Sequence, residues 1–288
     1  MLVCIGLPFY NVEDYLDDAI LSIINQSYTN WKLLLLNDGS TDRSLEIAMK
    51  YKNDVRIEIL SDGENRGLIY RLNELISKCD AKYFARMDAD DVMHPNRLEK
   101  QIAFLEKNLL VDIVGSWAYS IDTDNNVHGV LKTNCNPRLI SDVFKHACFI
   151  HPSIIGRTDW FKKNEYSADF IRVEDEELWT RTILESTFVN LAEPLLFYRE
   201  VGIPYLRKYL KTMSGERKLI HQIYADPFSI VKYKMLVKNY AKSVAFTVFS
   251  VLHLQNYLIK RRSERISFKE SHLAKISLNK AVYNKMNI

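Results

Sequence analysis

The stretch YFARMDADD, residues 83–91, joins a short apolar run to three carboxylates. The apolar run is typical of a buried β-strand, so Asp88, Asp90 and Asp91 are expected where that strand ends. Carboxylates gathered at such a place repel one another and raise one another's pKa values unless a cation or hydrogen-bond donors compensate them. The stretch therefore predicts a strand end at which negative charge has to be neutralised.

Short apolar runs alternate with amphipathic stretches on both sides of this segment. Strands are expected at residues 2–9, 31–38, 55–60 and 81–88, and helices at residues 12–27, 42–52, 67–79 and 95–108. Strands that are apolar on both faces and joined by helices indicate a parallel sheet with right-handed crossovers. We therefore expect an α/β fold with a mostly parallel central sheet flanked by helices, and ligands at the carboxyl ends of its strands.

Three polar clusters follow three of these strands: PFYN (residues 8–11), NDGSTD (residues 37–42) and MDADD (residues 87–91). They are expected to meet at one edge of the sheet. In the second cluster Asp38 can accept the imide N–H of a uracil. The alternative is a simple turn, in which Gly39 supplies a free φ angle and Ser40 or Thr41 caps the next helix.

The other two clusters also allow more than one interpretation. Pro8 ends the first strand or lies near a ligand, and Tyr10 covers the sheet edge or stacks on a base. Asp88 and Asp90 form a D-x-D pattern, which can point two carboxylates at one hard cation. The alternative is that Asp91 caps the following helix while its two neighbours are solvated.

At this point the sequence resembles the family 2 glycosyltransferases, inverting enzymes of the GT-A (Rossmann-like) fold, of the bacterial polysaccharide and O-antigen type. The resemblance covers about the first 200 residues. It rests on PFYN, NDGSTD, ENRGL (residues 64–68), MDADD, HPSIIGR (residues 151–157) and VEDEELW (residues 173–179), which occur in the family's order.

The resemblance implies the roles of individual residues. Nucleotide-sugar contacts are implied for Pro8, Tyr10, Asn11, Asp38, Arg66 and Asp88. Asp90, with Asp88, would hold Mn²⁺ or Mg²⁺, which would offset the charge on the departing diphosphate. The acidic pair before a helix would contain the catalytic base, here Asp175 with Glu174 beside it.

The chemistry of an inverting transfer explains this last assignment. The acceptor hydroxyl attacks the anomeric carbon as the nucleoside diphosphate leaves, so a carboxylate must take the hydroxyl proton. The alternative for Glu174 and Asp175 is an acidic first turn favoured by the helix dipole. His151 is a candidate contact for the acceptor or a phosphate, or else a partly buried histidine with satisfied hydrogen bonds.

Two departures from the family pattern limit the resemblance. Relatives carry a histidine shortly after the pair that corresponds to Tyr198 and Arg199, whereas this chain continues with Glu200. A third metal ligand or diphosphate contact from that segment is therefore in doubt. The QxxRW motif of processive synthases is absent from the sequence, so we expect the addition of single sugars.

The expected function is the transfer of one sugar from a nucleoside-diphosphate sugar, a UDP-sugar, to a hydroxyl of a glycan acceptor that is lipid-linked. One alternative is a nucleotidyltransferase that makes sugar nucleotides, but the segment after the first strand is acidic where a triphosphate needs glycines and cations. The other is a non-catalytic protein that binds nucleotide sugars. The intact Asp88, Asp90 and Asp175 argue against it.

Charge divides the 288-residue chain into two parts. Residues 205–288 hold 17 Lys and Arg against 4 Asp and Glu, whereas residues 1–204 hold 22 against 32. We expect a GT-A catalytic domain over residues 1–204 and a basic helical region over residues 205–288. No nucleic-acid partner is expected; an anionic membrane surface is the expected partner of the basic region.

Helices are expected at residues 205–225 and 227–265 in this basic region. The most apolar part, residues 244–254, is shorter than the roughly 20 residues that span a bilayer. Lysines at 232, 234, 238 and 242 precede it, and basic residues at 260, 261 and 262 follow it. Two interpretations stay open: an interfacial helix on anionic lipid, or a hairpin packed on the catalytic domain with a basic outer face.

Composition bears on the compartment. The chain is 47% hydrophobic and 26% charged, as in globular proteins with a full core. Its four cysteines form no CxxC pair, and the N-terminus lacks the basic segment of a signal peptide. We therefore expect reduced thiols, no structural zinc and a cytoplasmic protein, peripheral on the inner face of the cell membrane.

Overall fold

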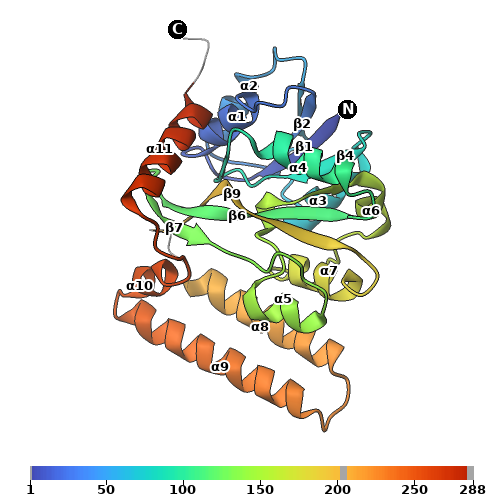
Figure 1. The fold of residues 1–288 in the computed structure, drawn as a ribbon, viewed down its shortest axis with the longest axis vertical. Helices are drawn as coiled ribbons and strands as arrows, with labels where there is room; N and C mark the ends of the chain where they lie inside the picture. Colours follow the sequence, from blue (N-terminus) through green and yellow to red (C-terminus); the bar gives the residue numbers. More distant parts are fainter. Residues whose placement is uncertain (1, 202–205, 284–288) are drawn as a thin grey trace.

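The computed structural model describes residues 2–201 and 206–283, and within these residues nine strands form one sheet (Figure 1). The strands are β1 (Val3–Phe9), β2 (Trp31–Asn37), β3 (Ile57–Ser61), β4 (Tyr83–Arg86), β5 (Val92–Met93), β6 (Ile113–Asp122), β7 (Val127–Leu131), β8 (Ile155–Arg157) and β9 (Phe188–Val201). The order across the sheet is β3-β2-β1-β4-β8-β6-β9-β5, and β7 pairs with β6 outside this path.

Helices surround the sheet. They are α1 (Leu16–Ile24), α2 (Ser44–Met49), α3 (Leu68–Ser77), α4 (Arg97–Lys107), α5 (Ile140–His146), α6 (Thr158–Lys163), α7 (Glu174–Thr182), α8 (Leu206–Ile223), α9 (Ile230–Val251), α10 (Gln255–Lys260) and α11 (Phe268–Val282). A 3₁₀ turn, His151–Ser153, precedes β8. The first four strands and helices lie where the sequence predicts them. Helices α1 and α2 are shorter than predicted, since residues 13–15 and 50–52 are turns.

The sheet is parallel where the sequence predicts it and mixed beyond. Strands β3, β2, β1 and β4 run parallel, as expected for apolar runs joined by helices. On the far side of β4, β8 runs antiparallel to both β4 and β6, whereas β9 runs parallel to β6. The α/β expectation of a mostly parallel central sheet is therefore confirmed. Strands β5, β7 and β8 are too short for their apolar pattern to predict them, and β6 pairs irregularly with its neighbours β7 and β9.

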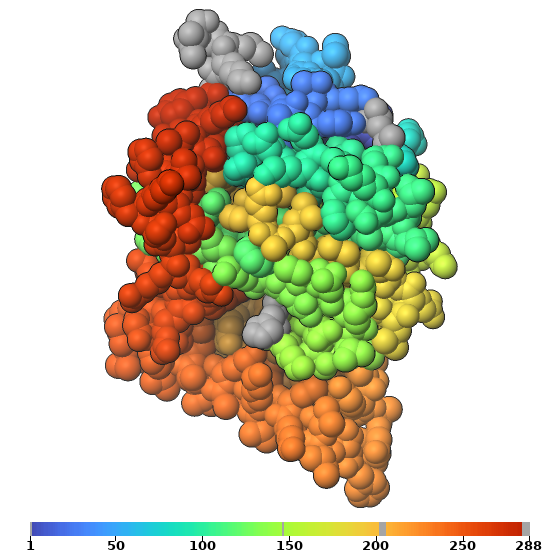
Figure 2. All heavy atoms as spheres, in the orientation of Figure 1, coloured from blue at the N-terminus to red at the C-terminus, as the bar shows by residue number. Residues whose placement is uncertain are grey.

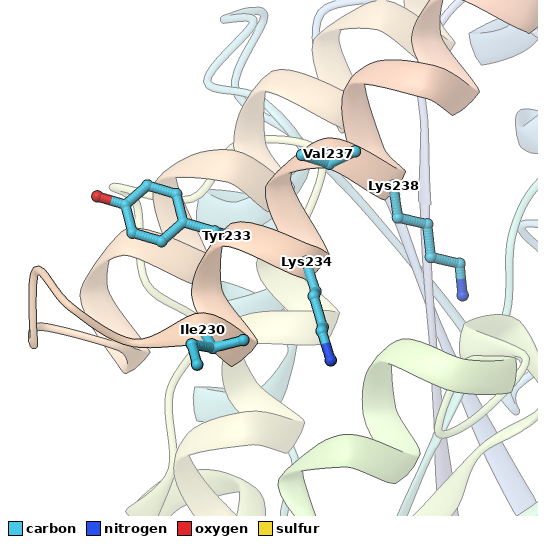
Figure 3. Close-up of a pocket in the computed structure, with 5 residues that line it drawn as sticks. All are labelled: Ile230, Tyr233, Lys234, Val237 and Lys238. Carbon is cyan, nitrogen blue, oxygen red and sulfur yellow. The ribbon is translucent and has the colours of Figure 1, made fainter.

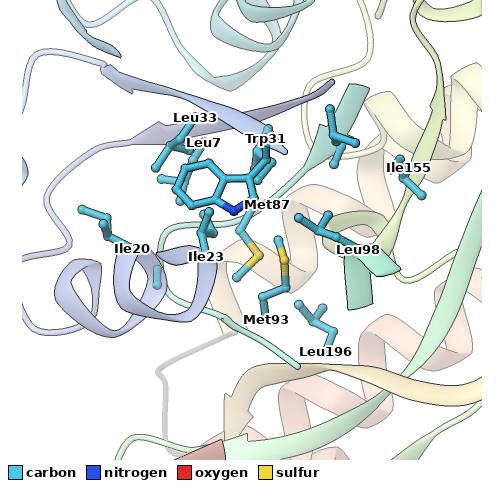
Figure 4. Packing of buried hydrophobic residues seen from close by; sticks show 14 of the residues in the cluster. Leu7, Ile20, Ile23, Trp31, Leu33, Met87, Met93, Leu98, Ile155 and Leu196 are labelled. Atoms are coloured by element: carbon cyan, nitrogen blue, oxygen red, sulfur yellow. The ribbon is translucent and has the colours of Figure 1, made fainter. Parts of the chain in front are cut away.

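Two apolar layers hold the helices to the sheet. On one face, side chains of α1 and α4 pack on β1 and β2 around Trp31 and Met87, as Figure 4 shows. On the other face, α3, α6 and α7 pack around Phe84, Phe161 and Trp179. Because both faces are covered, β1 is buried along its whole length.

Pro8 does not end the first strand, which continues to Phe9. The pairing of β1 with β4 ends at Gly6 and Arg86, two residues before Pro8. Proline has no N–H to donate to a neighbouring strand, so it is tolerated where a ladder stops. The chain after β4 leaves β1 there, and this is where the acidic stretch of residues 87–91 begins.

The C-terminal region packs on the rest of the chain. Helix α8 contacts the segment before α7 through Leu219, which packs with Phe170 and Val173, and α9 pairs with α8 at the end of the molecule (Figure 1). Helix α11, which the sequence does not predict, returns to α1, where Nδ2 of Asn25 donates hydrogen bonds to the carbonyls of Ala281 and Tyr283. The domain boundary expected between residues 204 and 205 lies outside the described residues.

Figure 2 shows α8, α9 and α10 as a continuous orange layer across one end of the molecule. None of the helices within the described part of the chain combines the length and the apolar character that crossing a bilayer requires. Helices α8 and α9 form the packed hairpin of one of the two interpretations, and the interaction with anionic lipid stays a prediction.

Candidate active site

Arg86, the last residue of β4, lies at the centre of the candidate site. Its side chain is buried, and its Nη2 atom is 2.7 Å from Oδ1 of Asp88. Burial opposes its charge, whereas the carboxylates of Asp88, Glu174 and Asp175 favour it, so the pKa of Arg86 stays above its usual value. Its Nε and Nη1 atoms are buried without a hydrogen-bond partner among the described residues. A guanidinium with two unused donors therefore faces carboxylates from two parts of the chain.

The acidic stretch links the middle of the sheet to its edge. Asp88, Asp90 and Asp91 each bring an oxygen within 4.8 Å of the others. Asp91 is buried, and its Oδ1 accepts a hydrogen bond of 2.8 Å from the backbone N–H of Arg199. The expected alternative, in which Asp91 caps the next helix, is wrong, because the N-cap of α4 is Asn96.

Arg199 holds this stretch from the neighbouring strand β9. Its Nε donates to the carbonyl of Asp90 at 2.7 Å, and its Nη1 donates to the carbonyl of Asp122 at 2.6 Å. These bonds use backbone acceptors, so the side-chain oxygens of Asp88 and Asp90 are left to face one another. Burial and the charge of Asp88 raise the pKa of Asp90 to about 6. Burial and both neighbours raise the pKa of Asp91 as well.

The second acidic group begins α7. Glu174 is buried, whereas the side chain of Asp175 keeps 26% of its surface exposed. Burial and the neighbouring Asp175 raise the pKa of Glu174 to about 7, and burial raises that of Asp175. The helix N-terminus and Arg86 oppose this shift. Of the two carboxylates, Asp175 is the one that a substrate can reach.

His151 lies against Asp175 and is enclosed. Its Nδ1 atom is 3.8 Å from Oδ2 of Asp175, and its Nε2 atom is 2.8 Å from the hydroxyl of Tyr166. Burial and the charge of Arg86 lower the pKa of His151 well below its usual value, so the ring is neutral. The interpretation as a buried histidine with a satisfied hydrogen bond fits these contacts. A contact with acceptor or phosphate would have to be made at the ring's 9% exposed surface.

The carboxyl end of β2 forms the third part of the site. Oδ1 of Asp38 accepts hydrogen bonds from the backbone N–H of Arg66 at 2.7 Å and from Nε of Arg71 at 2.8 Å. Its Oδ2 accepts one from the N–H of Gly67 at 3.0 Å. Asp38 and Arg66 are therefore close together, as expected, but Arg66 makes this contact with its backbone. The guanidinium of Arg66 instead contacts Glu64 and the Tyr70 ring.

The first two polar clusters meet, as expected for adjacent parallel strands. Oδ1 of Asn11 accepts a hydrogen bond of 2.8 Å from the N–H of Thr41, and the N–H of Asn11 donates to Oγ of Ser40 at 3.1 Å. Ser40 and Thr41 therefore hold Asn11 and do not cap α2, whose N-cap is Arg43. Tyr10 is 49% exposed beside them, so its ring is available to a ligand.

Gly39 in this turn has the conformation that the sequence predicts. Its φ angle is 71°, and a Cβ atom there would lie 2.8 Å from the backbone nitrogen of Asn65. Both the turn and the contact with the loop before α3 therefore require glycine. The carboxyl ends of β1, β2 and β4 lie next to one another, and the expected convergence on one sheet edge is confirmed.

Sequence reasoning missed four residues of this site: Arg71, Arg86, Tyr166 and Arg199. Arg71 and Arg86 are buried arginines in otherwise apolar segments, a pattern that signals paired charge. Tyr166 and Arg199 reach the site from other elements, and nothing in their sequence neighbourhood points to it.

The model of the family described as glycosyl transferase family 2 matches residues 4–164, which is more than half of the chain. The chain belongs to this family. It is therefore a glycosyltransferase, and the resemblance seen in its motifs is confirmed. The sugar-nucleotide nucleotidyltransferase and the non-catalytic binding protein are set aside.

Curated relatives agree with this assignment. The putative glycosyltransferase EpsE of Bacillus subtilis is 34% identical over 76% of this chain and 81% of its own length. The Escherichia coli enzyme WfgD is named UDP-Glc:alpha-D-GlcNAc-diphosphoundecaprenol beta-1,3-glucosyltransferase. It is 29% identical over 62% of this chain and 68% of its own length.

Solved structures share the fold. The S. aureus TarS structure (residues 1–349) in complex with UDP-GlcNAc superposes with a TM-score of 0.66 at 16% identity, covering 98% of this chain and 82% of that one. A mannosyltransferase from Pyrobaculum calidifontis, in complex with GDP-Man and Mn²⁺, has a TM-score of 0.61 at 12% identity, covering 97% and 85%. These likenesses confirm the GT-A fold.

Proposed function

We propose that this glycosyltransferase moves one sugar from a UDP-sugar, with inversion at the anomeric carbon, to a hydroxyl of a glycan acceptor. The acceptor is carried on a polyprenyl-diphosphate lipid at the inner face of the membrane, and the product enters surface polysaccharide biosynthesis. The names of relatives support the donor and acceptor classes: WfgD uses UDP-Glc and a diphosphoundecaprenol-linked sugar.

One observation carries the proposal. The buried guanidinium of Arg86 offsets the negative charge of two acidic groups, the partly exposed carboxylate of Asp175 and the acidic stretch of residues 87–91. Arg86 contacts Asp88 directly, and its charge also acts on Asp175. A donor diphosphate held near Asp88 and an acceptor held near Asp175 would therefore lie on either side of one buried guanidinium.

Asp175 is the base in the proposed reaction. Its carboxylate takes the proton of the acceptor hydroxyl while the oxygen bonds to the anomeric carbon and the bond to the diphosphate breaks. A raised pKa makes the carboxylate a better proton acceptor than an ordinary aspartate, provided that it is ionised at the working pH. His151, neutral and 3.8 Å away, limits the positions of the Asp175 side chain.

The nucleoside is proposed to lie over the ends of β1 and β2. Tyr10 would stack on the base, and the remaining lone pairs of Asp38 would accept its imide N–H, while Pro8, Asn11 and Arg66 shape the surrounding turn. Asp38 suits this role because three N–H donors already fix its orientation. A rigid acceptor is what selects one base over another.

The acidic stretch fits a divalent cation. Asp88, Asp90 and Asp91 offer three carboxylates within 4.8 Å, and Oδ2 of Asp91 is buried without a partner in the described chain. Hard cations such as Mg²⁺ and Mn²⁺ prefer such oxygens. When bound there, the ion would offset negative charge on the leaving diphosphate. Asp91 would supply a third oxygen beside those of Asp88 and Asp90.

The test is a panel of nucleoside-diphosphate sugars with lipid-linked acceptors, in which nucleoside diphosphate release and product are both measured. Asp175→Asn should retain donor affinity and lose about 10²–10⁴-fold in transfer rate, because it keeps the shape of the side chain but not its basicity. Glu185→Gln, an exposed carboxylate on the far end of the same segment, is the control and should be unchanged. Normal transfer by Asp175→Asn together with loss by Glu174→Gln would move the base to Glu174.

A further inference from the structure

Helix α9 carries an exposed apolar stripe along the side that faces away from the rest of the molecule. The residues of this outer stripe recur every three or four positions and are each 49% to 70% exposed. They are Ile230, Tyr233, Val237, Tyr240, Val244, Val248 and Val251. Such spacing places all of them on one face of a helix. Contiguous apolar surface of this kind is uncommon on a protein that has no partner there.

The opposite face of α9 accounts for the core packing of the helix. Leu236, Asn239 and Phe246 are buried, and Phe246 stacks on Tyr209 of α8 with ring centroids 4.0 Å apart. Arg217 donates to Oδ1 of Asn239 at 2.6 Å. The fold therefore uses this face of α9 for the hairpin. At the border of the outer stripe the Tyr240 ring also contacts α8, with its centroid 4.6 Å from the guanidinium of Arg217.

The outer stripe extends beyond both ends of the helix. Phe228, in the turn before α9, is 86% exposed, and Leu252, Leu254 and Tyr257 after it are 49% to 60% exposed. The 22 residues of α9 alone span about 33 Å. Near its first turns the surface forms an open groove of about 440 Å³ lined by Ile230, Tyr233, Lys234, Val237 and Lys238 (Figure 3).

Positive charge borders the outer stripe, and α9 contains no acidic residue. Lys234 and Lys238 are exposed and extend side by side along one edge of the stripe, as Figure 3 shows. The other two lysines of the helix differ in burial: Lys232 is buried, whereas Lys242 is exposed, and the charges of both Lys242 and Lys238 also act on Glu216 of α8. Exposed Lys260 adds a cation beyond α9, at the end of α10.

We propose that the outer stripe is the face by which the protein docks on an anionic lipid bilayer. Its apolar side chains enter the interfacial region while Lys234 and Lys238 contact lipid phosphates, as in amphipathic helices that lie in the plane of a membrane. A second copy of the chain fits less well. Pairing across the stripe would bring lysines of one copy toward lysines of the other, with no acidic residue on α9 to offset them.

Docking on this face would hold the catalytic base near the lipid surface. Helix α8 packs on the start of α7, because Leu219 contacts Val173 and Gly215 lies directly against the same side chain, and α9 pairs with α8. The hairpin of α8 and α9 is therefore the layer between the start of α7 and the proposed membrane. An acceptor whose lipid remains in the bilayer could reach that end of the site. The docking itself does not depend on the proposed sugar transfer.

Flotation of the full chain with vesicles tests the proposal without donor or acceptor. Vesicles of neutral phosphatidylcholine are compared with vesicles that also contain 30% phosphatidylglycerol, a proportion chosen to give an anionic surface of roughly cellular charge. The full chain is expected to float with the anionic vesicles at low salt and to dissociate as salt increases. Failure to bind anionic vesicles at low salt would overturn the proposal.

Two variants with matched controls identify the face. Lys234→Glu with Lys238→Glu is expected to weaken binding at least about tenfold, whereas Lys50→Glu with Lys52→Glu, the same charge change at exposed positions of another surface, should weaken it far less. A triple variant in which Val237, Val244 and Val248 are replaced by Asn should no longer insert into the vesicles. Its control, in which exposed Val55, Leu109 and Leu110 are replaced by Asn, should still insert.

The same variants separate the membrane from other partners. If a variant of α9 and its control lost vesicle binding equally, the assignment of the docking face to α9 would be overturned. So would a dimer, seen by sedimentation, that the three valine substitutions dissociate. Turnover of a water-soluble acceptor should be unchanged in all four variants, so a failure of the proposed transfer would be seen separately from a failure of docking.

Discussion

Oδ1 of Asp38 accepts a hydrogen bond of 2.8 Å from Nε of Arg71, and both side chains are buried. The same guanidinium donates to Asp62 at 2.6 Å, to Glu74 at 2.8 Å and to the carbonyl of Glu64 at 2.6 Å. Arg71 thus joins the ends of β2 and β3 to α3. These contacts keep the pKa of Asp62 below its usual value. The floor of the proposed nucleoside site depends on this one arginine.

Arg71→Met should lower the free energy of unfolding by about 3–5 kcal/mol, because it leaves the buried carboxylate of Asp38 without its cation. Arg66→Met removes an exposed arginine from the same loop, and its effect should stay below about 1 kcal/mol. Urea unfolding followed by circular dichroism measures both. Equal midpoints for the two variants would mean that the Asp38–Arg71 pair contributes little beyond packing.

Asp90→Asn should weaken UDP binding at least about tenfold when Mn²⁺ is present and leave it unchanged in EDTA. The reason is that Asp90 offers an oxygen to the proposed cation, while its backbone carbonyl, which Arg199 holds, is retained. Isothermal calorimetry in the two buffers measures the difference. Asp124→Asn, in the exposed turn after β6, is the control. Mn²⁺-dependent binding that survives in Asp90→Asn would exclude Asp90 as a ligand.

The parallel half of the sheet and the convergence of three polar clusters follow from the sequence because apolar runs and strand ends are local features. Parallel strands place their carboxyl ends at one edge, so the meeting of Asn11 with Thr41 needs no further information. The candidate carboxylates are likewise visible as D-x-D and E-D patterns.

The partners of these carboxylates do not follow from the sequence. Arg199 reaches Asp90 and Asp91 only because Val92 of β5 pairs with Phe197 of β9. The pairing of β9 with β6 also shifts its register at several points. Register shifts of that kind leave no periodic signal. The contact between His151 and Tyr166 depends in the same way on an irregular loop. Helix α11 is missed because its buried residues are few and two of them, Ala274 and Ala281, are small.

Glu176→Gln should make stability less dependent on pH. Oε2 of Glu176 is buried with no partner in the described structure, and burial, Glu216 and Asp175 raise its pKa well above the usual value, which Lys242 only partly opposes. The folded protein therefore keeps a proton that the unfolded chain releases above about pH 4.5. Its contribution to stability is complete below that pH and is lost as pH rises toward the folded-state pKa.

The variant should therefore be more stable than the parent at pH 8, with a difference that grows by up to about 1.4 kcal/mol per pH unit above pH 4.5 until the folded-state pKa is reached. Urea unfolding at pH 5, 6.5 and 8 measures this slope. Glu174, Asp175 and Glu216 also have raised pKa values, so part of the dependence remains in the variant. Exposed Glu185→Gln should reproduce the parent curve, and a Glu176→Gln curve parallel to it would contradict the assignment.

Gly215→Ala should push α8 away from the segment that leads into α7. A Cβ atom at Gly215 would lie 2.7 Å from Cγ2 and 3.1 Å from Cγ1 of Val173, which is fully buried and directly precedes Glu174. Alanine is otherwise favoured over glycine inside a helix by about 1 kcal/mol. A net loss of stability, of about 1–2 kcal/mol, would therefore report the clash itself.

Val173→Ala tests this explanation, since it removes both of the atoms that the new methyl group would meet. If the clash is the cause, the double variant should be at least about 1 kcal/mol more stable than the sum of the single effects allows. Ser214→Ala, at the exposed neighbouring position of α8, supplies the propensity control. If the stability changes of Gly215→Ala and Val173→Ala were simply additive in the double variant, α8 would be free to shift against Val173. In that case the hairpin would not fix the position of Asp175, and docking α9 on a membrane would orient this proposed base less strictly than the contact suggests.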